Sequence, residues 1–392
     1  MMAMMAAMVA FSIDAMLPAL PEIAAELAPE APNRAQLVVG AFMLGLGVGS
    51  LFSGPLSDAW GRRTVVIGGI GLFILGALLA LVAPSMELLL LARALQGLGV
   101  AGPRIAPIAM VRDLYAGRHM ARITSFITTV FMLVPALAPS LGALIIHFGG
   151  WRAIFPAFVA FAALAGTWML LRQGETLAAQ ERRPFRAAGL REGFVEVIAN
   201  PLVRVSLLLL SLEFGALVAL LSSTQQVYAD SFGRGGSFPL WFAASALIAA
   251  GGTVLNATLV MQLGMRRLVL WSFGAQGALS LLAGGLFLTG MAEGGAGFAI
   301  WFAWSSAFLF GVGLIMGNLT ALALQALGHV AGMAASVVSA LSTIAGALLA
   351  VPVGLAFDGT PLPLIGGVAL LAGPGWVLSA RALAPAGRNG GA

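Results

Sequence analysis

Twelve long apolar segments follow one another along this 392-residue chain, separated by short clusters of charged, proline and glycine residues. A segment of about 20 apolar residues is long enough to cross a bilayer as an α-helix. The pattern therefore predicts an all-α membrane protein with twelve transmembrane helices. The predicted helices cover residues 1–27, 35–57, 64–83, 87–112, 122–147, 151–172, 202–228, 238–262, 267–290, 297–321, 329–357 and 361–383.

The composition excludes a soluble fold. Hydrophobic residues make up 60% of the chain and charged residues 9%, against roughly 45–50% and about 25% in ordinary soluble domains. The chain has no cysteine, which excludes disulfides and thiol chemistry. Its basic residues, all arginines, are dispersed rather than gathered on one face, so we expect no nucleic-acid partner.

The arginines are distributed unevenly among the connections between the predicted helices. With a cytoplasmic N-terminus, fifteen arginines fall on the cytoplasmic side and three, at positions 34, 152 and 234, fall outside. This positive-inside bias is typical of multi-pass membrane proteins. We therefore expect both termini in the cytoplasm, and we interpret residues 1–27 as a transmembrane helix rather than a cleaved secretory signal.

One polar stretch, residues 173–200, divides the twelve predicted helices into six and six. It mixes arginines with glutamates, which is typical of a solvated cytoplasmic linker. We therefore expect an N-terminal six-helix bundle at 1–172 and a C-terminal six-helix bundle with a short tail at 201–392. An arginine pair recurs at equivalent turns of the two halves, in W-G-R-R at 60–63 and G-M-R-R at 264–267, and repeated halves are common in transporters.

Between the second and third predicted helices the chain reads G-P-L-S-D-A-W-G-R-R at 54–63. This segment resembles the G-x-L-x-D-x-x-G-R-R/K signature of the major facilitator superfamily. The stretches L-A-R-A-L-Q-G-L-G at 91–99 and V-R-D-L-Y at 111–115 are similar to the family's intramembrane arginine motif and its cytoplasmic Arg-Asp terminus. The resemblance implies a conformational latch between the two halves, formed by Gly54, Asp58, Gly61, Arg62, Arg63 and Asp113.

Two further stretches, residues 12–27 and 317–336, resemble the Bcr/CflA-type drug:proton antiporters within this superfamily. That subfamily is associated with export of bicyclomycin, chloramphenicol and similar compounds. The resemblance implies a bacterial plasma (inner) membrane and a monomer. The chain departs from the subfamily's pattern at Met16, Gln225, Gln226 and Gln325, which we expect to be cavity positions, so the subfamily's substrate list does not transfer intact.

Charged residues inside predicted transmembrane helices are candidates for function, because a charge at the bilayer centre costs at least about 2.5–3.5 kcal/mol. Asp14 lies about 20 Å along the first helix, where its carboxylate could exchange a proton with the outside; the alternative is a helix-end charge paired with a neighbour. Arg93 could pair with Asp14 or orient an anionic or carbonyl group. Arg104, on the same helix face, either shares such a role or extends toward the membrane surface.

The seventh predicted helix carries a polar stripe that contains Glu213, Ser206 and Thr224. Because a stripe of this kind is costly against lipid, we expect it to face the central cavity. Glu213 would then bind a cationic substrate or a second proton; its alternative role is a hydrogen bond between helices. Gln96, an isolated polar residue one turn from Arg93, completes the predicted proton-coupling or substrate-binding set.

No enzyme motif is present: the sequence has no phosphate-binding Walker loop and no H-E-x-x-H metal motif. We therefore predict no catalytic residues, no metal and no cofactor, and we expect a proton gradient to supply the energy. The favoured hypothesis is an exporter of drugs or other amphipathic small molecules in exchange for protons. A proton-coupled transporter of a sugar or amino acid and a non-transporting membrane sensor remain as alternatives.

Overall fold

The computed structural model describes residues 1–182, 185, 187–292, 294–325, 327 and 331–383. The described residues form helices and no strand, and twelve helical segments among them are long and apolar enough to cross a membrane. This confirms the predicted fold class. The prediction placed the start of the fifth span at residue 122, whereas the helix begins at Gly117 and runs to Gly149.

The first six spans form an N-terminal bundle. In order they are α1 (Met2–Asp14), η1 (Leu17–Ala19) and α2 (Leu20–Leu27); η2 (Pro32–Gln36) and α3 (Leu37–Trp60); α4 (Arg62–Leu81); α5 (Met86–Leu114); α6 (Gly117–Gly149); η3 (Trp151–Ala153) and α7 (Ile154–Arg172). Within this bundle α3 and α4 pack on α5, α1 packs on α6, and α4 packs on α7.

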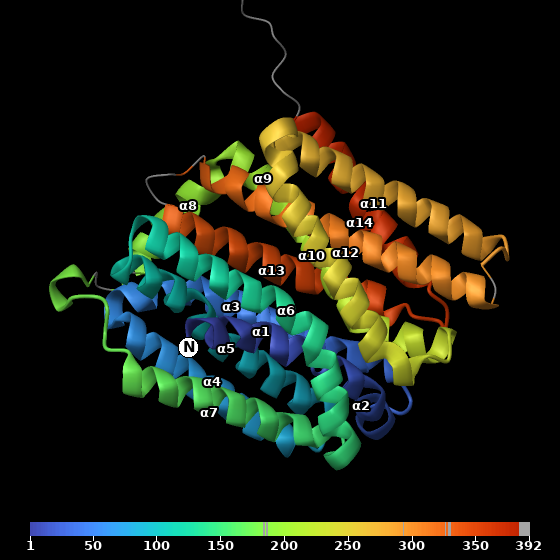
Figure 1. The fold of residues 1–392 in the computed structure, drawn as a ribbon, viewed down its shortest axis with the longest axis horizontal. Coiled ribbons are helices and arrows are strands. Elements are labelled where there is room, and N and C mark those ends of the chain that lie inside the picture. Colours follow the sequence, from blue (N-terminus) through green and yellow to red (C-terminus); the bar gives the residue numbers. More distant parts are fainter. Residues whose placement is uncertain (183–184, 186, 293, 326, 328–330, 384–392) are drawn as a thin grey trace, which may run out of the picture.

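The last six spans form a C-terminal bundle. In order they are α9 (Pro201–Gln226) and the π-helical η5 (Val227–Ser231); η6 (Gly235–Ser237) and α10 (Phe238–Leu263); α11 (Met265–Leu288); α12 (Gly294–Gln325); α13 (Ala331–Leu355); and α14 (Leu362–Ala382). The two bundles lie side by side (Figure 1) and meet mainly through α3 with α13 and α6 with α10.

The two ends of the paired bundles differ, and we name them by their elements. The linker end carries the Gly61 turn between α3 and α4 together with α8 (Ala187–Ala199), and the distal end carries α2 and η2. Part of the predicted linker is therefore helical. Helix α8 packs against α9 and α13, and its Val197 is fully buried. The linker also contains the short η4 (Ala179–Glu181).

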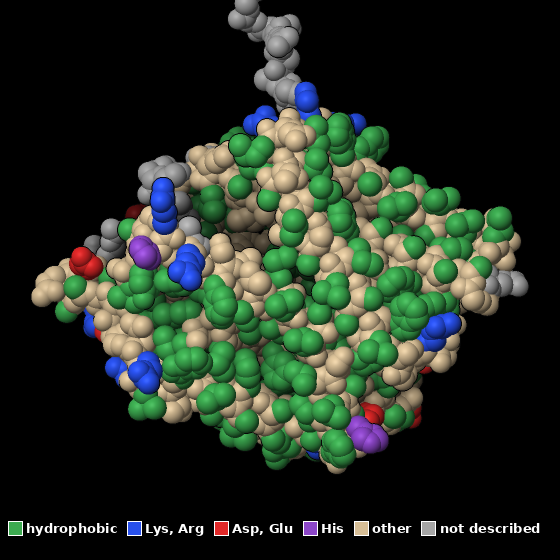
Figure 2. Space-filling view, in the orientation of Figure 1, with side chains coloured by type: hydrophobic (Ala, Val, Ile, Leu, Met, Phe, Trp, Pro, Cys, Tyr) green, Lys and Arg blue, Asp and Glu red, His purple; other side chains and the backbone are tan. Residues whose placement is uncertain are grey.

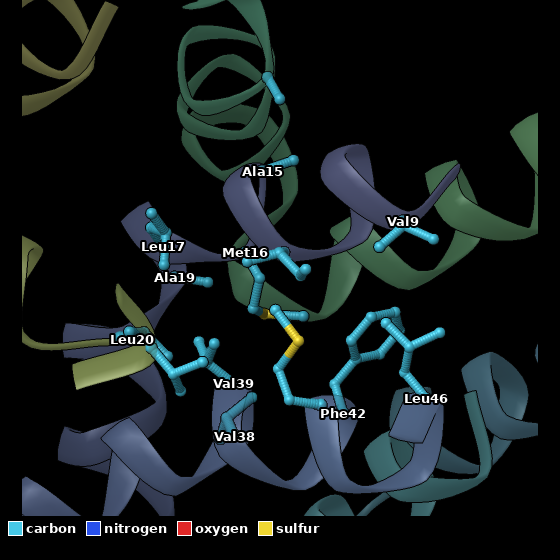
Figure 3. Close-up of a cluster of buried hydrophobic side chains, with 14 of the residues drawn as sticks. Val9, Ala15, Met16, Leu17, Ala19, Leu20, Val38, Val39, Phe42 and Leu46 are labelled. Carbon is cyan, nitrogen blue, oxygen red and sulfur yellow. The ribbon is translucent and has the colours of Figure 1, made fainter. Parts of the chain in front are cut away.

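The first span is interrupted near its middle. Proline has no backbone N–H and restricts the residue before it, and Pro18 and Pro21 follow the last residue of α1, Asp14, within one to two turns. Figure 3 shows Met16 pointing from this break toward α3, where Phe42 lies. Both side chains are fully buried, so the break is held against α3 by a packed apolar core.

On the face shown in Figure 2, hydrophobic and other uncharged atoms fill the middle of the molecule, and the charged side chains lie toward its margins. Large exposed apolar side chains include Leu91 on α5, Phe126 on α6, Met261 on α10 and Leu281 on α11. Exposed apolar surface of this extent matches a lipid environment rather than water.

Candidate functional site

A cavity of about 380 Å³ lies at the centre of the molecule, between the two bundles. Its walls come from α1, α3, α5 and α6 on one side and from α9, α10, α12 and α13 on the other. The lining is mostly apolar and includes Phe131, Phe214 and Phe242. Its volume and apolar character are those of a site for a small organic molecule.

Asp14 lies on the wall of this cavity. It is the last residue of α1 and is 4% exposed. Within the described part of the chain, its carboxylate makes no hydrogen bond or ion pair. An unpartnered carboxylate that faces an apolar cavity is free to bind a proton or a cationic group of a ligand.

Arg104 lines the same cavity from α5. Of the two roles that the sequence left open, a surface-directed side chain does not fit this position. Its guanidinium forms no ion pair or hydrogen bond with any residue that the structure describes, Asp14 included. Asp14 and Arg104 are the two charged side chains of the cavity lining, and they are not paired with each other.

Arg93 is fully buried beside the break in the first span. Its Nη1 donates to Oε1 of Gln96 at 2.8 Å, and its Nη2 donates to the backbone carbonyl oxygen of Ser12 at 2.9 Å. The rings of Phe42 and Phe158 lie 4.5 and 6.0 Å from its guanidinium carbon. The side chains of Arg93 and Asp14 form no ion pair, so Arg93 acts on the backbone next to Asp14 rather than on its carboxylate.

The reason for this contact is the free C-terminal end of α1. The amide of Met16, four residues after Ser12, donates instead to the carbonyl oxygen of Ile13. The carbonyl of Ser12 therefore lacks its usual donor four residues later. A cation at the C-terminal end of a helix also interacts favourably with the helix dipole.

The structure does not place Glu213 on the central cavity, which contradicts our expectation for the polar stripe of this helix. Glu213 is 1% exposed inside the C-terminal bundle, where its Oε1 accepts a hydrogen bond from Nε2 of Gln276 at 2.9 Å. The α9 residues that do line the cavity are Phe214, Leu217 and Leu221. A helical stripe shows which residues share a face, but the neighbouring helix α11 decides what that face meets.

Charged residues of the predicted latch meet at the linker end. Arg62 forms ion pairs with Asp58 and, at 3.3 Å, with Asp113. Gly61 adopts a φ of 98°, which favours glycine, and an added Cβ there would overlap the carboxylate of Glu175.

Glu175, at the start of the linker, accepts hydrogen bonds from the backbone amides that begin α4. The donors are the amides of Arg62 at 2.9 Å and Arg63 at 3.1 Å. Arg63 also donates from Nη2 to the carbonyl of Leu170.

The predicted link across the two halves is not made by these charges. The described partners of Asp58, Arg62, Arg63 and Asp113 all lie between residues 57 and 176. Gly54 is different, because it faces α13 of the C-terminal bundle: a Cβ added there would lie 2.9 Å from Oγ of Ser336. The ion pairs thus belong to the N-terminal bundle, while small residues make the contact between bundles.

The distal end is closed by hydrogen bonds between the bundles, which we call the distal polar network. Gln36 donates to Oε1 of Gln226 at 2.6 Å and accepts from Ser223 at 2.6 Å. Asn33 accepts from Gln226 at 2.9 Å and donates to the carbonyls of Leu355 and Phe357. At the linker end, by contrast, Figure 2 shows a hollow between the Gly117 end of α6 and the Leu263 end of α10.

Comparison with known proteins identifies the family. The model of the major facilitator superfamily matches residues 2–350. The chain belongs to the major facilitator superfamily.

Two curated relatives of this major facilitator protein are named for drug resistance. A bicyclomycin resistance protein homolog of Haemophilus influenzae is 29% identical over 346 residues, covering 86% of this chain and 84% of the relative. A chloramphenicol resistance protein of Pseudomonas aeruginosa is 35% identical over 183 residues, covering 46% of this chain and 41% of the relative.

The fold is also found among solved structures. The crystal structure of a D-xylose-proton symporter superposes with a TM-score of 0.77 at 14% identity, covering 96% of this chain and 95% of the other. The chain is therefore a multi-pass bacterial membrane transporter of small molecules with the major facilitator fold, and it is not an enzyme.

The four positions where this major facilitator protein departs from the subfamily pattern are absent from the described cavity lining, contrary to expectation. Met16 is buried in the core between α1 and α3, Gln226 belongs to the distal polar network, and Gln325 borders a hollow beside α11. Gln225 is also absent from the described cavity lining. Sequence position along a helix does not fix the direction in which a side chain points.

The distal polar network was missed by the sequence reasoning. Asn33, Gln36 and Gln226 are uncharged and lie at predicted helix ends, where polar residues are ordinary. Their pairing joins positions nearly two hundred residues apart, and a single sequence holds no periodic signal for such a contact.

Proposed function

We propose that this transporter exports drugs or other amphipathic small molecules in exchange for protons, by alternating access. The observation that carries the proposal is the unpartnered carboxylate of Asp14 on the central cavity. The drug-resistance names of the relatives support the substrate class. The proton gradient is the energy source in this proposal, and the chain works as a monomer without a cofactor.

In the proposed topology the linker end and both termini lie in the cytoplasm, as the arginine distribution favours. The conformation with a closed distal network and a hollow at the linker end is then the inward-facing state. Substrate enters the cavity from the cytoplasm or the inner leaflet. Opening of the distal polar network and closure of α6 against α10 at the linker end expose the cavity to the outside.

Exchange follows from competition at Asp14. A proton and a ligand group that needs the charged carboxylate, either a cation or the hydroxyl donors of uncharged chloramphenicol, cannot both occupy Asp14, so each disfavours binding of the other. A proton taken up outside displaces the substrate, and release of that proton inside restores the binding site. Arg93 is a positioning residue in this scheme, because it holds the backbone that carries Asp14.

The test measures accumulation of chloramphenicol and a lipophilic cationic dye in bacteria that lack their own pumps. Cells express the wild type, Asp14→Asn or the control Asp230→Asn, which removes an exposed carboxylate at the distal end. We expect low accumulation with the wild type and the control. A protonophore or Asp14→Asn should raise accumulation to the level of cells without the protein.

Equal accumulation in all cells, with the protein inserted in the membrane, would contradict drug export. Flux of a sugar or amino acid into sealed vesicles would then point to a metabolite transporter, and binding without flux would point to a sensor.

A further inference from the structure

The central cavity carries one acidic and one basic side chain that do not pair with each other. Asp14 and Arg104 project from neighbouring helices of the N-terminal bundle into the same space, and no ion pair or hydrogen bond joins them among the described residues. The other lining residues are uncharged, and most are apolar. The cavity therefore presents one acidic and one basic side chain against an otherwise mostly apolar lining.

An arrangement of this kind is costly once water leaves the cavity. A charge without a partner in a low-dielectric space loses its hydration and gains nothing in return. When the linker end closes around the cavity, both groups need a partner within it. A proton on Asp14 neutralises one of them, but Arg104 stays charged at any physiological pH.

We propose that the preferred substrates are zwitterionic amphiphiles, with a cationic group that binds Asp14 and an anionic group that binds Arg104. This inference rests on the proposed function and narrows its substrate class. The apolar body of the ligand packs against Phe131, Phe214 and Phe242, which line the same cavity. A volume of about 380 Å³ accommodates one compound of drug size.

The zwitterion also fits the proposed exchange. Its cationic group competes with the proton for Asp14, so protonation still releases the substrate. A purely anionic ligand on Arg104 would instead bind better when Asp14 is protonated, which favours movement of both in the same direction. A purely cationic ligand would leave Arg104 without a partner in the closed cavity.

The experiment uses three forms of one scaffold whose charges differ. Norfloxacin is a fluorescent zwitterion, its carboxyl methyl ester keeps the cationic group alone, and its N-acetyl derivative keeps the carboxylate alone. Equilibrium binding is measured on the full chain in lipid nanodiscs, and flux is measured in proteoliposomes with an imposed pH gradient. Binding and flux of ethidium, a lipophilic cation, are measured in parallel.

Four variants are compared with the wild type: Arg104→Gln, Arg104→Lys, Asp14→Asn and the control Arg118→Gln. Arg118 is exposed at the start of α6 and lies outside the cavity. Nanodisc preparations that elute as a single species and unfold at the wild-type temperature establish that each variant is folded.

We expect the wild type and Arg118→Gln to bind the zwitterion about tenfold more tightly than either singly charged form, since a hydrogen bond to a charged group contributes about 1.5–3 kcal/mol. Arg104→Gln should remove that preference over the ester without weakening binding of the ester. Arg104→Lys should restore part of it. Asp14→Asn should weaken binding of the zwitterion and the ester and strengthen binding of the N-acetyl form, because the neutral amide resembles protonated Asp14.

Equal binding of zwitterion and ester by the wild type, or unchanged zwitterion binding in Arg104→Gln, would overturn the zwitterion proposal. If ethidium is nevertheless driven across the membrane by the pH gradient, proton-coupled export stands and the substrate inference alone fails. If no compound is bound or moved, both fail.

Discussion

Nη2 of Arg93 lies 2.9 Å from the backbone carbonyl oxygen of Ser12, two residues before Asp14. The buried guanidinium therefore stabilises the free end of a broken helix, and the carboxylate of Asp14 has no partner among the residues that the structure describes. Had Arg93 paired with Asp14 directly, that carboxylate would be less available to a proton or a ligand. Because Arg93 binds the backbone of α1 and not the carboxylate, Asp14 stays available to a proton or a ligand.

We predict that Arg93→Leu destabilises the protein as well as reducing transport. It leaves the Ser12 carbonyl and the Gln96 amide oxygen without their donor, and hydrogen bonds to charged groups contribute about 1.5–3 kcal/mol each. The purified protein should therefore unfold several degrees below the wild type. Arg93→Lys should fall between the two, since one ammonium does not reproduce the planar guanidinium fork. If Arg93→Leu unfolds at the wild-type temperature, the hydrogen bonds of Arg93 do not stabilise the protein.

Glu175 provides a second test, at the linker end. Its carboxylate accepts hydrogen bonds from the backbone amides of Arg62 and Arg63. Glu175→Gln should weaken these hydrogen bonds and make the start of the linker more mobile. Because the chain has no cysteine, a Leu177→Cys substitution at a 9% exposed position reports this directly. Maleimide should label the cysteine several-fold faster when Glu175→Gln is also present. The same labelling rate with and without Glu175→Gln would show that the linker is held elsewhere.

The distal polar network should control access from the outside. Gln36→Leu removes its hydrogen bonds to Gln226 and Ser223 and should favour the state that is open at the distal end. A cysteine introduced as Ser222→Cys, at a position that is 4% exposed, should then react faster with a membrane-impermeant maleimide added to whole cells. No labelling from outside in either background would contradict the proposed topology.

Substitutions at two glycines of α3 should distinguish a loss of stability from a change in conformational preference. A Cβ at Gly45 would overlap the Ala94 backbone within the N-terminal bundle, whereas a Cβ at Gly47 would meet Ala340 and Ile344 across the interface. We expect Gly45→Val to lower the unfolding temperature. Gly47→Val should stay folded and raise the Ser222→Cys labelling rate.

Gly40→Val is the control for this pair, because nothing lies within 4 Å of its added Cβ. An unchanged labelling rate in Gly47→Val would show that the bundles do not separate along α3 and α13.

The sequence predicted the fold well because the bilayer constrains it strongly. Helix length and apolar content follow from membrane thickness, so the twelve spans can be placed from the sequence alone. The motif at 54–63 likewise indicated the family. The motif could not indicate that Arg62 forms its ion pairs within its own bundle, because those pairs depend on the positions of Asp113 and the linker in the fold.

The site was only partly predictable. Asp14 and Arg93 stood out because charges are rare inside transmembrane helices. Periodicity gave the face that Glu213 shares with its neighbours but not the helix opposite it, and so its position was predicted wrongly. The role of Arg104 was undecided for the same reason: its surroundings come from helices more than a hundred residues apart.

The most direct test of the account measures proton release from the purified, detergent-solubilised protein in weakly buffered solution. The ligand added is the compound whose cellular accumulation the wild type lowers most. We predict that it releases protons from the wild type and from Asp230→Asn, and none from Asp14→Asn. Equal proton release from Asp14→Asn and the wild type would contradict the claim that substrate and proton compete for Asp14.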